Sequence, residues 1–105
     1  MTKLSYVDLS VTSVSDAGLT HLKSLTNLST LHLDRTPISA KGLANVNELT
    51  SLTALHLRST QVTDIGLARL TGLTRLKLLD LRETWVSTAG FEEFGRLHPS
   101  VVVRY

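Results

Sequence analysis

The chain has 105 residues, of which 11 are Lys or Arg and 9 are Asp or Glu, so its formal net charge at pH 7 is +2. This length allows one domain, and so small a charge excess gives no argument for a nucleic-acid partner. Cysteine is absent, which excludes disulfides, a thiol nucleophile and a zinc site built from thiolates. We also expect no membrane contact, since no segment approaches the roughly 18 consecutive apolar residues of a span and the first ten residues lack a secretory-signal pattern.

Leucine recurs with a period of 24 residues, at Leu4, Leu28, Leu52 and Leu76. Further apolar residues follow each of these leucines in the same register. A fixed period of this size is the sequence signature of a solenoid. The period predicts a single domain over residues 1–105, with repeats at 4–27, 28–51, 52–75 and 76–99 and a terminal strand at 100–105.

Each repeat begins with a short predicted strand. The alternation LxxLxL puts Leu31 and Leu33, or Leu55 and Leu57, on one side of the strand and the residues between them on the other. A threonine follows at the same place in every repeat: Thr12, Thr36, Thr60 and Thr84. Its hydroxyl can bond the backbone of its own turn or of the next one, so we expect it to satisfy loop groups that leave the strand.

A short helix is predicted in the second half of each repeat. Ser or Thr at 15, 39, 63 and 87 are good N-caps, and Asp16 and Asp64 follow where a carboxylate favours the helix dipole. Apolar residues then recur at i and i+3, as in one buried stripe. These pairs are Leu19 and Leu22, Leu43 and Val46, Leu67 and Leu70, and Phe91 and Phe94.

A glycine stands in the first turn of every predicted helix, at Gly18, Gly42, Gly66 and Gly90. Glycine in a helix costs about 0.5–1 kcal/mol relative to alanine. Its recurrence therefore indicates that adjacent repeats approach too closely for a side chain. The spacings GxGxxG and GxxxxGK are both absent, so a phosphate-binding role has little support.

The pattern LxxLxLxxTx[VI][ST]xxGLxxLxxL resembles a leucine-rich repeat over essentially the whole chain. The segment Thr63-Asp64-Ile65-Gly66-Leu67 resembles the cysteine-containing subclass and its bacterial relatives, with Thr where those repeats more often have Asn or Cys. The resemblance implies a curved α/β solenoid, with parallel strands on the concave face and short helices on the convex face. It also implies that ligands bind mostly through concave side chains.

Parallel strands place equivalent residues of successive repeats side by side, so the outward columns follow from the sequence. The first column is Tyr6, Thr30, Ala54, Leu78 and Val102; the second is Asp8, His32, His56, Asp80 and Arg104; the third is Ser10, Asp34, Arg58 and Arg82. Tyr and Arg are favoured anchors at protein interfaces. The alternative is an ordinary solvated face, with Asp34 and Arg58 as a surface ion pair. The candidate partner-binding residues are Tyr6, Asp8, Thr30, His32, Asp34, His56, Arg58, Leu78, Asp80, Arg82, Arg104 and Trp85.

His32 and His56 are expected to be neighbours, bracketed by Asp8 and Asp80. Such a cluster can take zinc or a similar ion, or can form a proton-sensitive contact; the alternative is that both histidines simply sit in water. We assign no metal and no cofactor from the sequence. Trp85, on the loop after the fourth strand, is either a partner anchor or packs against the terminal repeat.

The function expected from these features is that of a non-catalytic interaction module that binds another protein through the concave face. The alternative is a structural protein that stacks end to end, because strand edges and the apolar seam look open at Leu4, Val7 and Leu9 and again near Val101 and Val103. An enzyme is not expected. The motifs GxSxG and HExxH are absent, and no serine is placed to complete a triad with His32 and Asp8.

Overall fold

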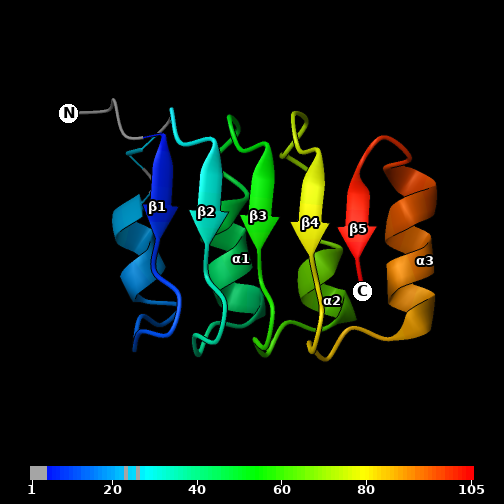
Figure 1. The fold of residues 1–105 in the computed structure, drawn as a ribbon, viewed down its shortest axis with the longest axis horizontal. Coiled ribbons are helices and arrows are strands. Elements are labelled where there is room, and N and C mark those ends of the chain that lie inside the picture. The colour runs from blue at the N-terminus through cyan, green and yellow to red at the C-terminus, as the bar shows by residue number, and fades with distance from the viewer. Residues whose placement is uncertain (1–4, 23, 26) are drawn as a thin grey trace.

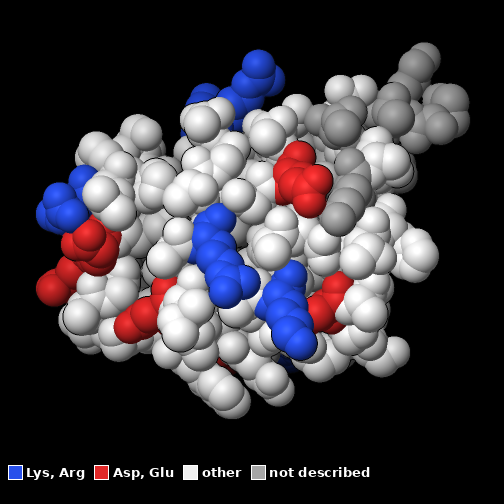
Figure 2. All heavy atoms as spheres, turned by 180° about the vertical axis from the view of Figure 1, so that it is seen from behind, with Lys and Arg blue, Asp and Glu red and all other residues white. Residues whose placement is uncertain are grey.

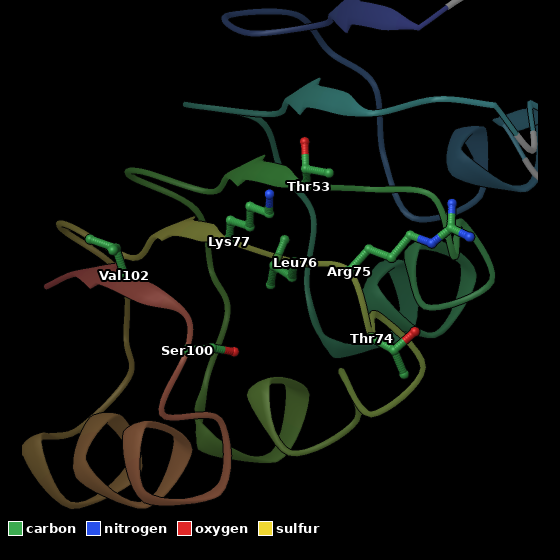
Figure 3. Close-up of a pocket in the computed structure, with 7 residues that line it drawn as sticks. All are labelled: Thr53, Thr74, Arg75, Leu76, Lys77, Ser100 and Val102. Atoms are coloured by element: carbon green, nitrogen blue, oxygen red, sulfur yellow. The ribbon is translucent and has the colours of Figure 1, made fainter.

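Five parallel strands form one sheet in chain order in the computed structural model, which describes residues 5–22, 24–25 and 27–105. The strands are β1 (Tyr6–Asp8), β2 (Thr30–His32), β3 (Ala54–His56), β4 (Leu78–Asp80) and β5 (Val102–Arg104). The helices are the 3₁₀ helix η1 (Gly18–Leu22), α1 (Ala40–Val46), α2 (Asp64–Leu67) and α3 (Thr88–Leu97). In Figure 1, α1 and α2 lie behind the strands, while η1 lies beside β1 and α3 beside β5, and Figure 3 shows the helices on one side of the sheet. This arrangement confirms the expected α/β solenoid. Leu4, the first leucine of the period, lies outside the described residues.

The strand register follows the sequence period without a slip. Leu31 pairs with Val7 on one side and Leu55 on the other, and Leu55 pairs in turn with Leu79. The outward residues pair in the same way, so the first and second expected columns are present along the sheet. A one-residue shift would turn every leucine to the solvent, which is why the register is so strongly specified.

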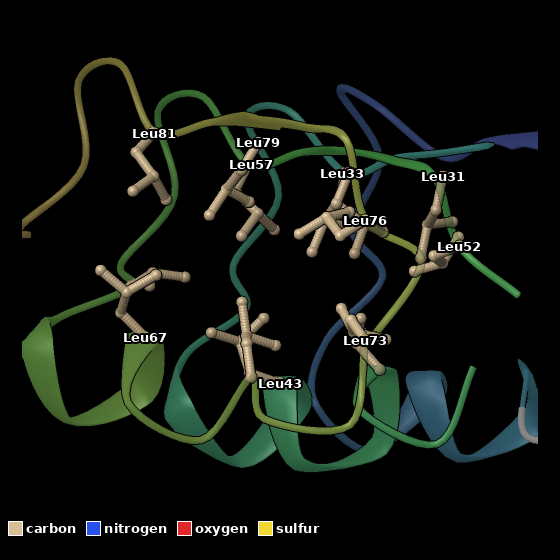
Figure 4. Packing of buried hydrophobic residues seen from close by; sticks show 14 of the residues in the cluster. Leu31, Leu33, Leu43, Leu52, Leu57, Leu67, Leu73, Leu76, Leu79 and Leu81 are labelled. Atoms are coloured by element: carbon tan, nitrogen blue, oxygen red, sulfur yellow. The ribbon is translucent and has the colours of Figure 1, made fainter. Parts of the chain in front are cut away.

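The core fills the space between the sheet and the helices. Leu31, Leu55 and Leu79 on the strands are fully buried, and Figure 4 shows Leu43 and Leu67 reaching toward the strand leucines from the helical side. These residues belong to one continuous cluster that runs through all the repeats. A repeat has no closed core of its own, so its stability depends on its neighbours.

The repeating threonine closes the turn after each strand. The Thr36 hydroxyl donates to the Leu33 carbonyl at 2.7 Å, and the Thr60 hydroxyl donates to the Leu57 carbonyl at the same distance. The hydroxyl thus bonds its own turn. The residue before each threonine has a positive φ of 55–59°, at Val11, Arg35, Ser59 and Glu83. That left-handed turn points its backbone N–H at the next repeat, as in the 2.8 Å bond from Arg35 N to Arg58 O.

The helices differ from the expected ones in capping. Ser39 and Thr63 precede α1 and α2 without a side-chain cap, and among the α-helices of the described chain only Ser87 accepts a hydrogen bond, from Gly90 N at 3.1 Å. The Ser39 hydroxyl instead donates to Asp16 of the preceding repeat. Asp16 and Asp64 therefore link repeats, in addition to lying near helix starts as expected.

The glycines mark the close approach that their recurrence predicts. A Cβ at Gly42 would lie 2.5 Å from the Asp16 carboxylate, and a Cβ at Gly66 would lie 3.2 Å from the Ala40 backbone. Both obstacles belong to the preceding repeat. The structural role expected for these glycines is confirmed at these positions.

The last strand is fixed by the chain's final residue. Tyr105 stacks on Phe91 of α3 with ring centroids 4.6 Å apart, and its hydroxyl donates to the Val86 carbonyl at 2.8 Å. Tyr105 therefore connects the end of β5 to α3 and to the loop before it. Within the described ranges, none of the helices combines the length and apolar character needed to cross a bilayer.

Candidate functional site

The sheet face is the surface made by the outward side chains of the strands and of the residues that follow them, that is, by the columns named above. Tyr6 is 55% exposed at one end of its column and Val102 is 63% exposed at the other, while Thr30, Ala54 and Leu78 between them are half-buried. The first column is thus a mostly apolar strip whose two end residues are exposed to solvent. Its residues change from repeat to repeat, whereas the inward column behind it is Val, Leu, Leu, Leu and Val.

The two histidines of the second column stack on each other. The ring centroids of His32 and His56 are 4.0 Å apart and the planes differ by 6°. Tyr6 leans on His32 at a centroid distance of 5.2 Å and a tilt of 50°. Neighbouring strands are about 4.8 Å apart, so the register pairing of His32 with His56 alone brings the two imidazole rings into contact. Burial and, secondarily, the adjacent His32 lower the pKa of His56.

Asp80 is a buried carboxylate at the end of β4. Only 2% of its side chain is exposed, and Arg82 binds it through Nε at 3.0 Å and Nη2 at 2.7 Å. Burial acts to raise the pKa of Asp80, but the hydrogen bonds from the Arg82 side chain and backbone outweigh it, so the pKa is lowered. The carboxylate also lies 4.0 Å from His56 Nδ1.

The ion pair between Asp34 and Arg58, which the alternative of a solvated face included, is absent among the described residues. Asp34 Oδ1 accepts the backbone N–H of Arg58 at 2.8 Å, while the Arg58 guanidinium contacts Glu83 Oε2 at 3.3 Å. The long arginine side chain reaches the next repeat, where an acidic residue outside the columns meets it. Arg58 Nε is buried and has no hydrogen-bond partner within the described part of the chain.

The structure brings most of the candidate residues onto one surface and leaves one apart. Trp85 lies on the loop beyond β4 and is 67% exposed, which argues against its packing against the terminal repeat. The sequence did not predict the roles of two acidic residues. Glu83 holds Arg58, and Asp34 joins the histidine pair that the sequence placed between Asp8 and Asp80. Spacing gave a signal for Asp34, since it lies two residues after His32 and so shares its side of the chain.

The surfaces outside the sheet face offer weaker candidates for a binding site. Acidic and basic side chains are interspersed on the helical side (Figure 2), and the described residues form no basic stripe there. An open hollow of about 630 Å³ lies where β4 and β5 begin, lined in part by Lys77, Arg75 and Ser100. Arg75 extends away from the other two in Figure 3, so the polar groups do not converge on one point.

Comparison with known proteins identifies the repeat. A family model described as "Leucine Rich repeat" matches residues 48–70, and no curated protein sequence matches the chain. A leucine-rich-repeat protein of Leptospira interrogans is similar in structure over 99% of this chain and 32% of its own, with 19% identity and a TM-score of 0.66. An internalin of Listeria monocytogenes is similar over 99% of this chain and 35% of its own, with 18% identity and a TM-score of 0.59.

The chain thus spans about a third of the length of each of these bacterial proteins. Neither match assigns the repeats to the cysteine-containing subclass. The family match identifies residues 48–70 as a leucine-rich repeat, and the similar structures show that the whole chain has the fold of a leucine-rich-repeat protein.

Proposed function

We propose that the chain is a non-catalytic interaction module that binds a partner protein through the sheet face. The observation that carries this proposal is the contrast between the two sides of the strands. The inward residues are nearly uniform, while the outward residues at the same registers range from Tyr6 to Val102 and from Asp8 to Arg104. A face that served only as a solvated surface would need no such mixture of aromatic, apolar and charged groups.

The chemistry of the face suits a protein surface. Tyr6 and Val102 supply exposed apolar area at the two ends of the sheet, and Leu78 supplies a half-buried contact beside Val102. Arg58 offers less than the sequence suggested, because its Nε is buried and its Nη2 contacts Glu83 Oε2. The argument for Arg82 as a free anchor is weaker than the sequence suggested, because its guanidinium already binds Asp80.

Site-specific crosslinking from both sides of the molecule tests the proposal. A photoreactive residue replaces Thr30 or Val102 on the sheet face, or Lys41 on α1 as the matched helical control, in extract from the source organism. We expect one discrete crosslinked protein from the sheet-face positions and none from position 41. Substituting Val102→Glu in the Thr30 probe should then weaken that product. Crosslinking from position 41 alone, or the same products from both sides, would contradict the proposal.

A second candidate is end-to-end association. Val7, Leu9 and Val14 of the first repeat are only partly buried, whereas Leu31, Leu33 and Ile38 at the same positions of the second repeat are fully buried. Among the described residues, the first repeat thus presents an incompletely covered apolar seam next to the outer edge of β1, which pairs only with β2 there. Light scattering behind size exclusion over a concentration series decides between the candidates. Growth of the particle with concentration supports association, and a monomer at every concentration removes it.

A further inference from the structure

The outward side chains of β2 and β3 place two imidazoles and a carboxylate together near the middle of the sheet face. His32 and His56 are register partners, and Asp34 follows His32 on the same side of its chain. One ligand atom from each of these side chains lies within 4.8 Å of the other two. No other trio of His, Cys, Asp or Glu in the described ranges meets that condition.

The carboxylate of this trio is held by the main chain. Asp34 Oδ1 accepts the Arg58 N–H at 2.8 Å, and the Asp34 N–H donates to Ser10 Oγ at 3.2 Å. The first bond holds the carboxylate and the second holds the Asp34 backbone, and no hydrogen bond of the described residues uses Oδ2, which is left for a further ligand. Unlike Asp80, Asp34 has no arginine guanidinium on its carboxylate among the hydrogen bonds of the described chain.

The histidines are suited to the role by position. Both are half-buried, so their rings are placed by the sheet yet reach the surface. Asp80 Oδ2, 4.0 Å from His56 Nδ1, is close enough to orient that ring with a small rotation, in the manner of a carboxylate behind a metal-binding histidine.

We propose that His32, His56 and Asp34 bind one divalent transition-metal ion of the zinc, nickel or copper class. Imidazole ligands favour these ions over Mg²⁺ and Ca²⁺, which prefer sets made of oxygen atoms. Three protein ligands leave at least one coordination position open, to be filled by water or by a group from outside the chain. The site lies within the sheet face but does not depend on its binding a protein.

Metal binding has to open the histidine stack. Zinc lies about 2.0–2.1 Å from each nitrogen, and tetrahedral angles then put two nitrogens about 3.3 Å apart. A bound ion also lies in the plane of each imidazole, which two nearly parallel rings cannot both satisfy. The rings must therefore turn from the 6° stack, so the ion leaves a signature on both histidines that a surface contact would not.

The first experiment titrates the untagged chain with zinc chloride at pH 7.5, followed by calorimetry and by NMR of the histidine ring protons. We expect saturable binding of one ion per chain, reversed by a chelator. The ring signals of His32 and His56 should shift as the stack opens, while those of His21 and His98 should stay in place. Acidification to about pH 5.5 should weaken binding, because protons compete for imidazole nitrogens.

Variants assign the ligands. His32→Gln and His56→Gln keep a polar side chain of similar size and should each lower the affinity by about tenfold or more. Asp34→Asn keeps an oxygen for the Arg58 N–H and should also weaken binding. The double variant His21→Gln, His98→Gln is the control and should bind as the parent does. The proposal fails if zinc, nickel and copper ions show no saturable binding, if His32→Gln and His56→Gln leave it unchanged, or if the control loses it.

Discussion

Asp64 binds both polar groups of Ser87 in the following repeat. Its Oδ1 accepts the Ser87 N–H at 2.7 Å, and its Oδ2 accepts the Ser87 hydroxyl at 2.6 Å. Gly90 lies over the same carboxylate, where a Cβ would overlap it. Asp16 and Ser39 repeat the arrangement earlier in the chain, with Gly42 over the carboxylate. An aspartate, a serine and a glycine thus clamp neighbouring repeats on the helical side.

Replacing Asp64 by Asn should lower the melting temperature at pH 7 and should lose its effect in acid. The hydrogen bonds from Ser87 lower the pKa of Asp64, so the folded chain releases this proton more readily than the unfolded chain. The stabilisation is present above the unfolded pKa and disappears as the pH falls through the folded value. Thermal unfolding at pH 7 and at about pH 2 measures this.

Glu92→Gln on α3 is the matched control for the same loss of one negative charge. Glu92 is exposed and does not belong to the aspartate–serine–glycine contacts between repeats. An equal melting-temperature change for both variants would mean that net charge, and not the bond to Ser87, causes the effect.

Alanine at Gly90 and at Gly95 should have opposite effects, although both glycines lie in α3. A Cβ at Gly95 meets nothing within 4 Å, so Gly95→Ala should stabilise the chain by about 0.5–1 kcal/mol through helix propensity. Gly90→Ala should destabilise it, because the new Cβ displaces the Asp64 carboxylate from Ser87. Urea unfolding gives both free energies.

The clamp itself is tested by combining substitutions. In an Asp64→Ala background the obstacle to a Cβ at position 90 is gone, so Gly90→Ala should lose its penalty and the two changes should not add. Additive effects would show that Gly90 is required for some reason other than this carboxylate.

Valine at Thr60 should cost about 1–3 kcal/mol, since it leaves a buried carbonyl without its partner. Thr60 is 3% exposed, and its hydroxyl bonds the Leu57 carbonyl at 2.7 Å. Thr12 makes the same bond to Leu9 at 2.6 Å in an exposed turn, where water can replace it. Thr12→Val should therefore cost much less. Urea midpoints at equal m-values compare the two, and equal losses would place the effect in the unfolded chain.

The sheet could be predicted from the sequence because the period runs without insertion. Four leucines spaced by 24 residues determine which residues pair, and the same spacing predicts that His32 and His56 are neighbours, as their strands confirm. The glycines were predictable for a related reason. Their cost in a helix makes sense only if something lies close by, and the regular stacking means that this is the preceding repeat.

The sequence could not predict which of several nearby partners a side chain contacts, even where the strand register was known. Arg58 lies beside Asp34 but is long enough to reach Glu83, and the competition between two acidic partners is decided by rotamers. Helix type was also open, because Leu19 and Leu22 at i and i+3 share a face in a 3₁₀ turn as well as in an α-helix. Ser39 occupies the N-cap position as expected, but its hydroxyl does not cap the helix, since a carboxylate of the preceding repeat lies within its reach.

Arg82→Gln should destabilise the chain at pH 7, and the loss should shrink on acidification. Without the guanidinium, Asp80 would keep its burial and the backbone N–H of residue 82 but lose the side-chain hydrogen bonds that help to offset the burial, so its pKa should rise. In the parent, the lowered pKa of Asp80 contributes stability above the unfolded pKa that is lost as the pH falls through the folded value. The parent and the variant should therefore converge in acid.

Lys41→Gln, at an exposed position of α1, is the control for losing one positive charge away from Asp80. Thermal unfolding at pH 7, 5 and 3 follows both variants, and a gap that stays constant with pH would contradict the role of Asp80. The result also decides how the sheet face can be probed. Arg82→Glu would set a second carboxylate against Asp80, so a loss of partner capture in that variant would report on folding and not on the interface.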